Sequence, residues 1–255
     1  MRGLWATLRN AFAEAAAKPA ALATQMFVMA ANDFVWVIFW VLFFDRVGDI
    51  GGWDRDRILL LQAVLTAAGG VSLGIFANAR RIGMMAVGGE LDAVLSLPVP
   101  PLSHVLVRRI EPINLGDLAF GVVLFAIVGN PTPQRTAIFV LVVLASAVLL
   151  TSFLVLTGAL AFFLGRSESG ELGFHAMLLL GAYPVDVFAG AVKVLLFTVV
   201  PAAFVAAVPA RLIDDFDLVR AVELLSVAVV FTMAASATFT LGLRRYTSGS
   251  VWTRA

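Results

Sequence analysis

Long apolar stretches separated by short polar segments dominate the chain and predict transmembrane helices. They cover about residues 22–44, 58–79, 113–128, 136–164, 171–183 and 221–243. The stretch at 136–164 is the clearest, because its 29 residues include no charged side chain. Since about 20 apolar residues cross a bilayer as a helix, the pattern predicts an all-α integral membrane protein with six transmembrane helices. We treat residues 1–255 as a single membrane domain.

The first 19 residues follow a different pattern. Leu4, Trp5, Leu8, Ala11 and Phe12 recur at the spacing of one helical face, with charged residues between them. This arrangement is typical of an amphipathic helix that lies in the membrane interface. The segment also lacks the uninterrupted apolar core of a cleavable signal peptide, so residues 1–19 are expected to be an interfacial helix.

Residues 80–112 are too polar and too rich in proline to cross a membrane as one helix. Leu91, Val94 and Leu95 have helical spacing, which predicts a short helix with one apolar face. Glu90 and Asp92 add charge beside that face, and three prolines between 98 and 101 are expected to end the helix.

The stretch 184–210 is apolar, but it contains Asp186 and Lys193 and is interrupted by Pro201 and Pro209. Its length allows a proline-kinked seventh span. It also allows a re-entrant helical hairpin, whose free backbone groups are tolerated where protein or water covers them. Asp186 and Lys193 are seven residues apart, about two turns on one helical face, and we expect both to point away from lipid.

Basic residues are distributed unevenly between the predicted loops. With six spans and both termini inside, 11 of the 18 Lys and Arg residues lie on the inner side. Positive residues favour the cytoplasmic side of a membrane protein. This asymmetry weakly favours a multi-pass protein of the cell membrane with both termini in the cytoplasm over a seven-span arrangement.

A few polar residues interrupt the predicted spans. Asn32 and Asp33 lie in the first span, Asp117 lies near the start of the third, and His175 lies in the fifth. Intramembrane charge is costly, which makes such residues candidates for a translocation path or for structural pairing. We expect His175 to be buried and hydrogen-bonded, and His104, in segment 80–112, to be solvated.

Composition narrows the possible functions. Hydrophobic residues make up 61% of the chain and charged residues 14%, against roughly 25% charged in soluble domains. There is no cysteine and there are two histidines, which excludes thiolate and three-histidine metal sites. The net charge is +1, so no nucleic-acid partner is expected. The 255 residues contain no GxxxxGK[ST] motif, which predicts that any ATPase is a separate subunit.

Two stretches resemble a known family. GELDAVLSLPVPPLSHVL at 89–106 resembles the cytoplasmic GE-x-D-x-x-L…P…L segment of bacterial ABC export permeases of the second export type. YPVDVF…VKVLLFTVVPAAFVAAVPARLI at 183–213 is similar to a YP…P…PA segment found before the last span in one six-span subfamily. One departure is visible, because residues 96–97 are Ser-Leu where the family often has a basic residue before the proline.

The resemblance implies an architecture and partners. Two six-span subunits, either identical or paralogous, would pair with a dimer of cytosolic ABC ATPases and contact membrane lipids. ATP and Mg²⁺ would bind the ATPase, and this chain would hold no cofactor and no metal. The segment at 80–112 would carry the coupling helix, and 184–210 would form an extracellular re-entrant hairpin between spans five and six. The implied coupling residues are Gly89, Glu90, Leu91, Asp92, Val94, Leu95 and Pro98, and the implied gate residues are Tyr183, Pro184, Asp186, Phe188, Lys193, Pro201 and Pro209.

The expected function is therefore the permease subunit of an ATP-driven exporter, which moves an amphipathic or lipid-like substrate or drug outward and performs no covalent chemistry. Two alternatives stay open on the sequence. An ion-gradient-driven secondary transporter would show matching broken helices in two repeats, and an integral-membrane lipid-modifying enzyme would show clustered His, Asp or Arg at one membrane face.

Overall fold

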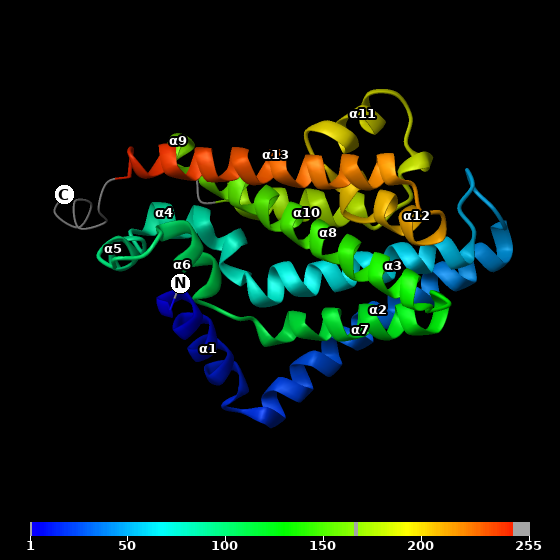
Figure 1. Cartoon of the computed structure of the whole chain (residues 1–255), viewed down its shortest axis with the longest axis horizontal. Helices are drawn as coiled ribbons and strands as arrows, with labels where there is room; N and C mark the ends of the chain where they lie inside the picture. Colours follow the sequence, from blue (N-terminus) through cyan, green and yellow to red (C-terminus); the bar gives the residue numbers. More distant parts are fainter. Residues whose placement is uncertain (1, 166–167, 247–255) are drawn as a thin grey trace.

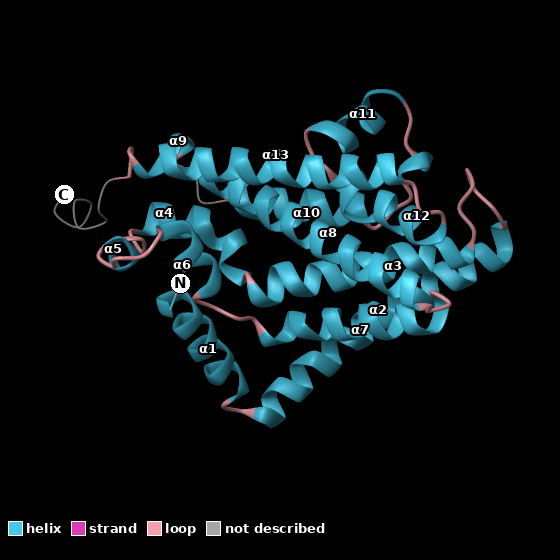
Figure 2. Cartoon of the chain, in the orientation of Figure 1, coloured by secondary structure: helices cyan, strands magenta, loops and turns pink. Residues whose placement is uncertain are grey.

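The computed structural model describes residues 2–165 and 168–246, and helices make up nearly all of their regular structure (Figure 2). One isolated bridge, between Ile50 and Trp53, is the exception among these residues. The helices are α1 (Arg2–Ala16), α2 (Pro19–Val47), α3 (Arg55–Gly69), η1 (Gly70–Ile75), η2 (Ala77–Arg81), α4 (Ile82–Gly88), α5 (Asp92–Leu95), α6 (Pro101–Val107), η3 (Pro112–Asn114), α7 (Leu115–Val128), α8 (Pro133–Ala159), α9 (Ala161–Leu164), α10 (Ser169–Gly181), η4 (Val185–Val187), α11 (Gly190–Thr198), η5 (Ala203–Ala207), α12 (Val208–Asp214) and α13 (Leu218–Leu243).

The all-helical membrane fold predicted from the apolar pattern is confirmed. Four helical segments are long and apolar enough to cross a membrane, at Pro19–Val47, Arg55–Ile75, Pro133–Leu164 and Leu218–Leu243. Two bent pairs raise the number to six if each counts as one span. The pair formed by α6 with the helix at Pro112–Val128 bends by 72°, and the pair formed by α11 with the helix at Ala203–Asp214 bends by 67°.

The predicted fifth span is as short in the structure as its apolar stretch in the sequence. It forms α10, which has 13 residues and is therefore about 20 Å long. The hydrocarbon core of a bilayer is about 30 Å thick, so α10 is too short to cross it without a tilt or local thinning. The helix ends at Gly181 and cannot extend much further, because the ring of Pro184 cannot continue an α-helix.

Helix starts follow the local sequence closely. Side chains of Asp54, Thr132 and Asp217 accept hydrogen bonds from the first backbone N–H groups of α3, α8 and α13. Such capping satisfies donors that have no partner within the helix. Pro19 and Pro133 occupy the first turns of α2 and α8, where the missing N–H of proline costs nothing.

Helices α3 and α8 form the centre of the molecule, while α2 and α13 lie at its edge (Figure 1). In their most apolar windows, 83% of the residues of the α3 segment are buried, against 22% in α13 and 17% in α2. Glycine allows α7 to approach α3 closely. A Cβ atom on Gly121 would lie 2.6 Å from the Ala63 carbonyl oxygen, and one on Gly70 would lie 2.3 Å from the Leu118 nitrogen.

The bundle has two ends, which we name by a helix at each. The α12 end gathers the loops around residues 48–54, 129–132, 182–187 and 214–217, and the α5 end gathers α1, α4, α5, α6 and residues 244–246 (Figure 1). Helices α2, α3, α7, α8, α10 and α13 run between the two ends. Segment 187–210 begins and ends at the α12 end, because Asp186, which precedes the segment, accepts a hydrogen bond from Arg211, which follows it.

Candidate functional site

The α5 end contains a short projecting segment between α4 and α6. Gly89 ends α4 in the left-handed conformation at φ +76°, and the Glu90 N–H bonds the Met85 carbonyl oxygen 3.2 Å away. Glycine adopts this conformation without steric cost. The chain then forms only one helical turn, α5, before the prolines. The short helix predicted around Leu91, Val94 and Leu95 is therefore present as a single turn.

Burial divides the predicted coupling residues into two groups. Leu91 and Val94 point into the chain's own core, with exposed fractions of 1% and 0%, whereas Glu90, Leu95 and Pro98 are exposed. The prediction that Leu91, Val94 and Leu95 form one face for a partner is therefore wrong for this conformation. A one-turn helix must be anchored by tertiary contacts, and Leu91 and Val94 provide that anchor.

Polar contacts fix the base of the segment. The Asn78 side-chain amide donates to the Val105 carbonyl oxygen over 2.9 Å, which joins η2 to α6. Tyr246, which follows α13, packs edge-on against Phe162 and adjoins Asp92. Burial raises the pKa of Tyr246 to about 12, and the Asp92 carboxylate contributes to that rise. The tyrosine is therefore a neutral contact at any physiological pH.

The α12 end is organised around Asp186. Its carboxylate accepts hydrogen bonds from Trp53 Nε1 and from Lys193 Nζ, each over 2.9 Å, and from Arg211 Nη2. The Arg211 guanidinium also lies over the Trp53 ring, 5.0 Å from its centroid. Burial acts to raise the pKa of Asp186, but the Lys193 and Trp53 hydrogen bonds and the Arg211 charge outweigh it, so this pKa lies below its ordinary value.

The side chains of Asp186 and Lys193 meet, but the expectation that they share one helical face is wrong. The two residues do not share one helical face, because η4 ends at Val187 and α11 begins only at Gly190. The left-handed Gly190, at φ +59°, turns the chain so that Lys193 reaches back. The ion pair therefore closes the turn between η4 and α11.

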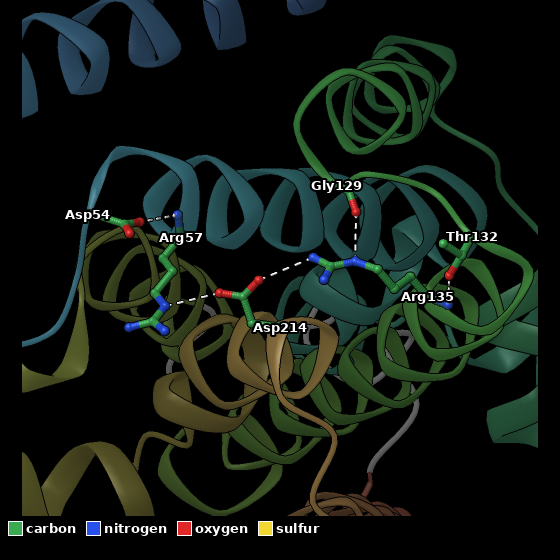
Figure 3. A network of polar contacts seen from close by, with 6 residues as sticks. All are labelled: Asp54, Arg57, Gly129, Thr132, Arg135 and Asp214. Atoms are coloured by element: carbon green, nitrogen blue, oxygen red, sulfur yellow. Dashed lines mark hydrogen bonds and ion pairs between the residues drawn. The ribbon is translucent and has the colours of Figure 1, made fainter.

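A second carboxylate, Asp214 at the end of α12, joins two further helices (Figure 3). It accepts from Arg57 Nε of α3 over 3.0 Å and from Arg135 Nη2 of α8 over 3.1 Å. Arg135 Nε also donates to the Gly129 carbonyl oxygen over 2.8 Å. These contacts connect the end of α12, which follows segment 187–210, to the first turns of α3 and α8 and to the loop before α8.

The remaining predicted gate residues lie around this network. Tyr183 packs edge-on against Trp40 of α2, with 5.8 Å between the ring centroids. Phe188 is half-buried, and the prolines are buried. Pro201 lies at the break between α11 and η5, where the helix axis bends by 67°, and Pro209 lies in the first turn of α12. The buried prolines are Pro184, Pro201 and Pro209.

The intramembrane polar residues are brought together only in part. Asp33 and Asp117 lie within hydrogen-bonding reach of each other between α2 and α7, and they are 7% and 6% exposed. Asn32 is exposed. His175 is also exposed, and its ring nitrogen bonds the Glu171 carbonyl oxygen over 2.8 Å. His104 is 8% exposed. The expectations of a buried His175 and a solvated His104 are therefore both wrong.

Sequence reasoning missed five members of the α12-end network, Trp53, Arg57, Arg135, Arg211 and Asp214. Their partners are between 25 and 157 residues away, and no motif spacing links them. For all of them except Arg135, the available signal was the concentration of charge in loop 45–57 and stretch 211–220. Within the described ranges 2–165 and 168–246, no three His, Asp or Glu side chains form a group that could hold a metal ion.

A family model described as "ABC-2 family transporter protein" matches residues 28–250, which is most of the chain. No curated protein and no solved structure matches. The match covers both the short α5 segment and the polar network of the α12 end.

Proposed function

The chain belongs to the ABC-2 family of transporter proteins, and from that premise we propose that it is the membrane subunit of an ATP-driven exporter. It is a multi-pass membrane protein, and the 255 residues contain no phosphate-binding motif of an ATPase. Energy must then come from a partner. We propose a dimer of cytosolic ABC ATPases, which would bind ATP and Mg²⁺, and a second permease copy or paralogue.

The exposed part of the α5 segment is the proposed contact for the ATPase. The observation that carries this proposal is the division of burial, with Leu91 and Val94 anchored inside and Glu90, Leu95 and Pro98 presented outside. An element that transmits force between subunits needs rigid attachment on one side and free contact groups on the other. Leu95 is 42% exposed, which suits it to insert into a shallow groove on the partner.

We place the α5 end in the cytoplasm and the α12 end outside. The uneven distribution of Lys and Arg supports this orientation. Segment 184–210 then forms a re-entrant hairpin on the extracellular side, supported by the bond between Asp186 and Arg211 across its two ends. Pro201 and the bend beside it would form the tip that enters the outer leaflet.

The proposed cargo is an amphipathic or lipid-like molecule or drug that enters from the inner leaflet or cytoplasm. Two copies would switch access when ATP closes the ATPase dimer, and the polar residues Asn32, Asp33 and His175 would lie along or beside the path. No residue of this chain is proposed to react covalently with the cargo.

Purification of the tagged chain from its own membranes tests the proposal. We expect an ABC ATPase to copurify and to hydrolyse ATP. The double variant Glu90→Ala with Leu95→Ala is expected to reduce turnover at least about tenfold, since removing an interfacial anchor costs more than about 1.4 kcal/mol. The control Asp56→Ala removes an exposed acid at the α12 end. Absence of the ATPase, or equal turnover in all three proteins, would refute the proposal.

A further inference from the structure

A cavity of about 880 Å³ lies at the α5 end. Helices α1 and α2, which meet at an angle there (Figure 1), both contribute to its lining. Its walls come from the last turns of α1, the first turns of α2, the linker at 108–112 and the α4–α5 segment. Sites for small molecules have volumes of about 300–1,000 Å³, so the cavity can hold a ligand of lipid-headgroup size.

The cavity carries more positive than negative charge. Lys18, Arg81, Arg108 and Arg109 line it, against three glutamates, Glu14, Glu90 and Glu111. Arg109 and Glu111 bond each other over 2.7 Å. Among the described residues, Lys18, Arg81 and Arg108 have no ion pair. Three cations are therefore available to bind an anion.

The helix that forms one wall places the cavity at the membrane surface. Trp5 and Phe12 of α1 are 68% and 41% exposed, as expected for side chains that dip into the headgroup layer, while Ala11 and Glu14 face the cavity. The first turns of α2 add Ala21 and Leu22. The lining thus offers cations for a phosphate and apolar groups for the start of an acyl chain.

We propose that this cavity binds the phosphodiester headgroup of a phospholipid or a similar phosphate-bearing amphiphile, with Arg81 and Arg108 as its principal anion ligands. Arginine suits this role because its guanidinium bonds phosphate oxygens in pairs, and basic pockets between membrane helices on the cytoplasmic side bind lipid headgroups. Glu90 and Ala93 of the α5 segment also line the cavity. That the ligand is cargo entering from the inner leaflet rests on the proposed function.

Calorimetric titration of the full-length chain in detergent tests the site without any ATPase. The probes are dihexanoyl phosphatidylglycerol, inorganic phosphate and dihexanoyl glycerol. We expect the phospholipid to bind at least about tenfold more tightly than either other probe. Arg81→Gln with Arg108→Gln is expected to weaken it about 100-fold, because two charge-assisted hydrogen bonds are lost. Arg46→Gln, an exposed cation at the other end of α2, should change nothing.

A third variant tests the site with a substitution that should leave the fold intact. Lys18 is exposed, so Lys18→Gln leaves no cavity in the core, and we expect it to weaken phospholipid binding about threefold. Unchanged binding in the double variant, or equal binding of dihexanoyl glycerol, would overturn the proposal. Inorganic phosphate binding as tightly as the phospholipid would overturn the amphiphile assignment. Headgroup binding without a copurifying ATPase would refute the proposed exporter and leave the site intact.

Discussion

The two ends of the bundle are held together by different forces. At the α12 end, Asp186 and Asp214 each bond cations from distant elements, so most of the buried charge there is paired. At the α5 end, apolar side chains anchor a single helical turn, and several cations and acids that line the neighbouring cavity have no ion pair with any other described residue. The first arrangement stabilises a fixed surface, and the second leaves charged groups available to bind partners or ligands.

The contrast follows from the physics of charge at partial burial. Removing a half-buried carboxylate leaves its cation partners uncompensated, which costs far more than the loss of an exposed pair. An exposed charge without a partner lowers the free energy of unfolding very little, so it can remain free to bind a ligand or a partner. Stability and recognition are thus assigned to opposite ends of one chain, a division that the following substitutions test.

The largest expected effect is at the anchor of the α5 segment. Leu91→Ala removes a side chain that is 1% exposed, and it should lower the free energy of unfolding by about 3 kcal/mol. The matched variant Leu95→Ala, at 42% exposure, should change it by less than about 0.5 kcal/mol. Thermal unfolding in detergent measures both. Equal losses in the two variants would contradict the division of burial.

Breaking the α12 network should cost somewhat less. Asp186→Asn keeps the shape of the side chain but leaves Lys193 and Arg211 without a counter-charge, and we expect a loss of about 2–3 kcal/mol. The control is Asp45→Asn, because Asp45 pairs with Arg55 at 3.6 Å and both side chains are more than half exposed. That variant should lose less than about 0.5 kcal/mol. A comparable loss in both would show that the network does not stabilise this end.

A smaller coupling is expected between α8 and α12. Asp214→Ala and Arg135→Ala, made singly and together, should give a coupling energy of about 1 kcal/mol in a double-mutant cycle. The side chains are 27% and 25% exposed, which limits screening by solvent. If the losses from the two single substitutions simply add, the contact between Arg135 and Asp214 does not contribute to stability.

The contribution of the Asp186 ion pairs to stability at the α12 end should also depend on pH. Because the pKa of Asp186 is lowered in the folded protein, the stability from its ion pairs is fully present above its ordinary value of 3.8. It is lost as the pH falls through the lower folded pKa. Acid titration of the wild type should therefore show an added loss below about pH 4 that Asp186→Asn lacks. Identical titrations would argue against the lowered pKa.

The sequence predicted where the helices lie better than it predicted which of their residues are buried. Apolar stretches gave the main spans, because a bilayer demands about 20 apolar residues whatever packs beside them. The same apolarity conceals which face of a helix is buried, so His175 was expected inside although it shares an exposed face with Leu172 and Leu179. His104 was expected in solvent for the opposite reason, since the polar segment around it folds back onto the bundle.

The candidate sites show the same limit. The position of the α5 segment could be predicted from its glycines, charges and prolines, but the inward direction of Leu91 and Val94 depends on what lies beneath them. The contact of Asp186 with Lys193 spans only seven residues, whereas the bonds of Asp186 to Trp53 and Arg211 depend on the three-dimensional path of the chain. Contacts between distant segments leave no trace in residue spacing.

Accessibility labelling tests most directly whether segment 187–210 returns to the side it left. The chain contains no cysteine, so single cysteines can be introduced without further changes at exposed positions on either side of the segment, as Ala189→Cys and Phe216→Cys, and in the α5 segment, as Ser96→Cys. In intact cells, a membrane-impermeant maleimide should label the first two and should label Ser96→Cys only after the membrane is opened. Opposite labelling of Ala189→Cys and Phe216→Cys would establish a seventh span and contradict the account.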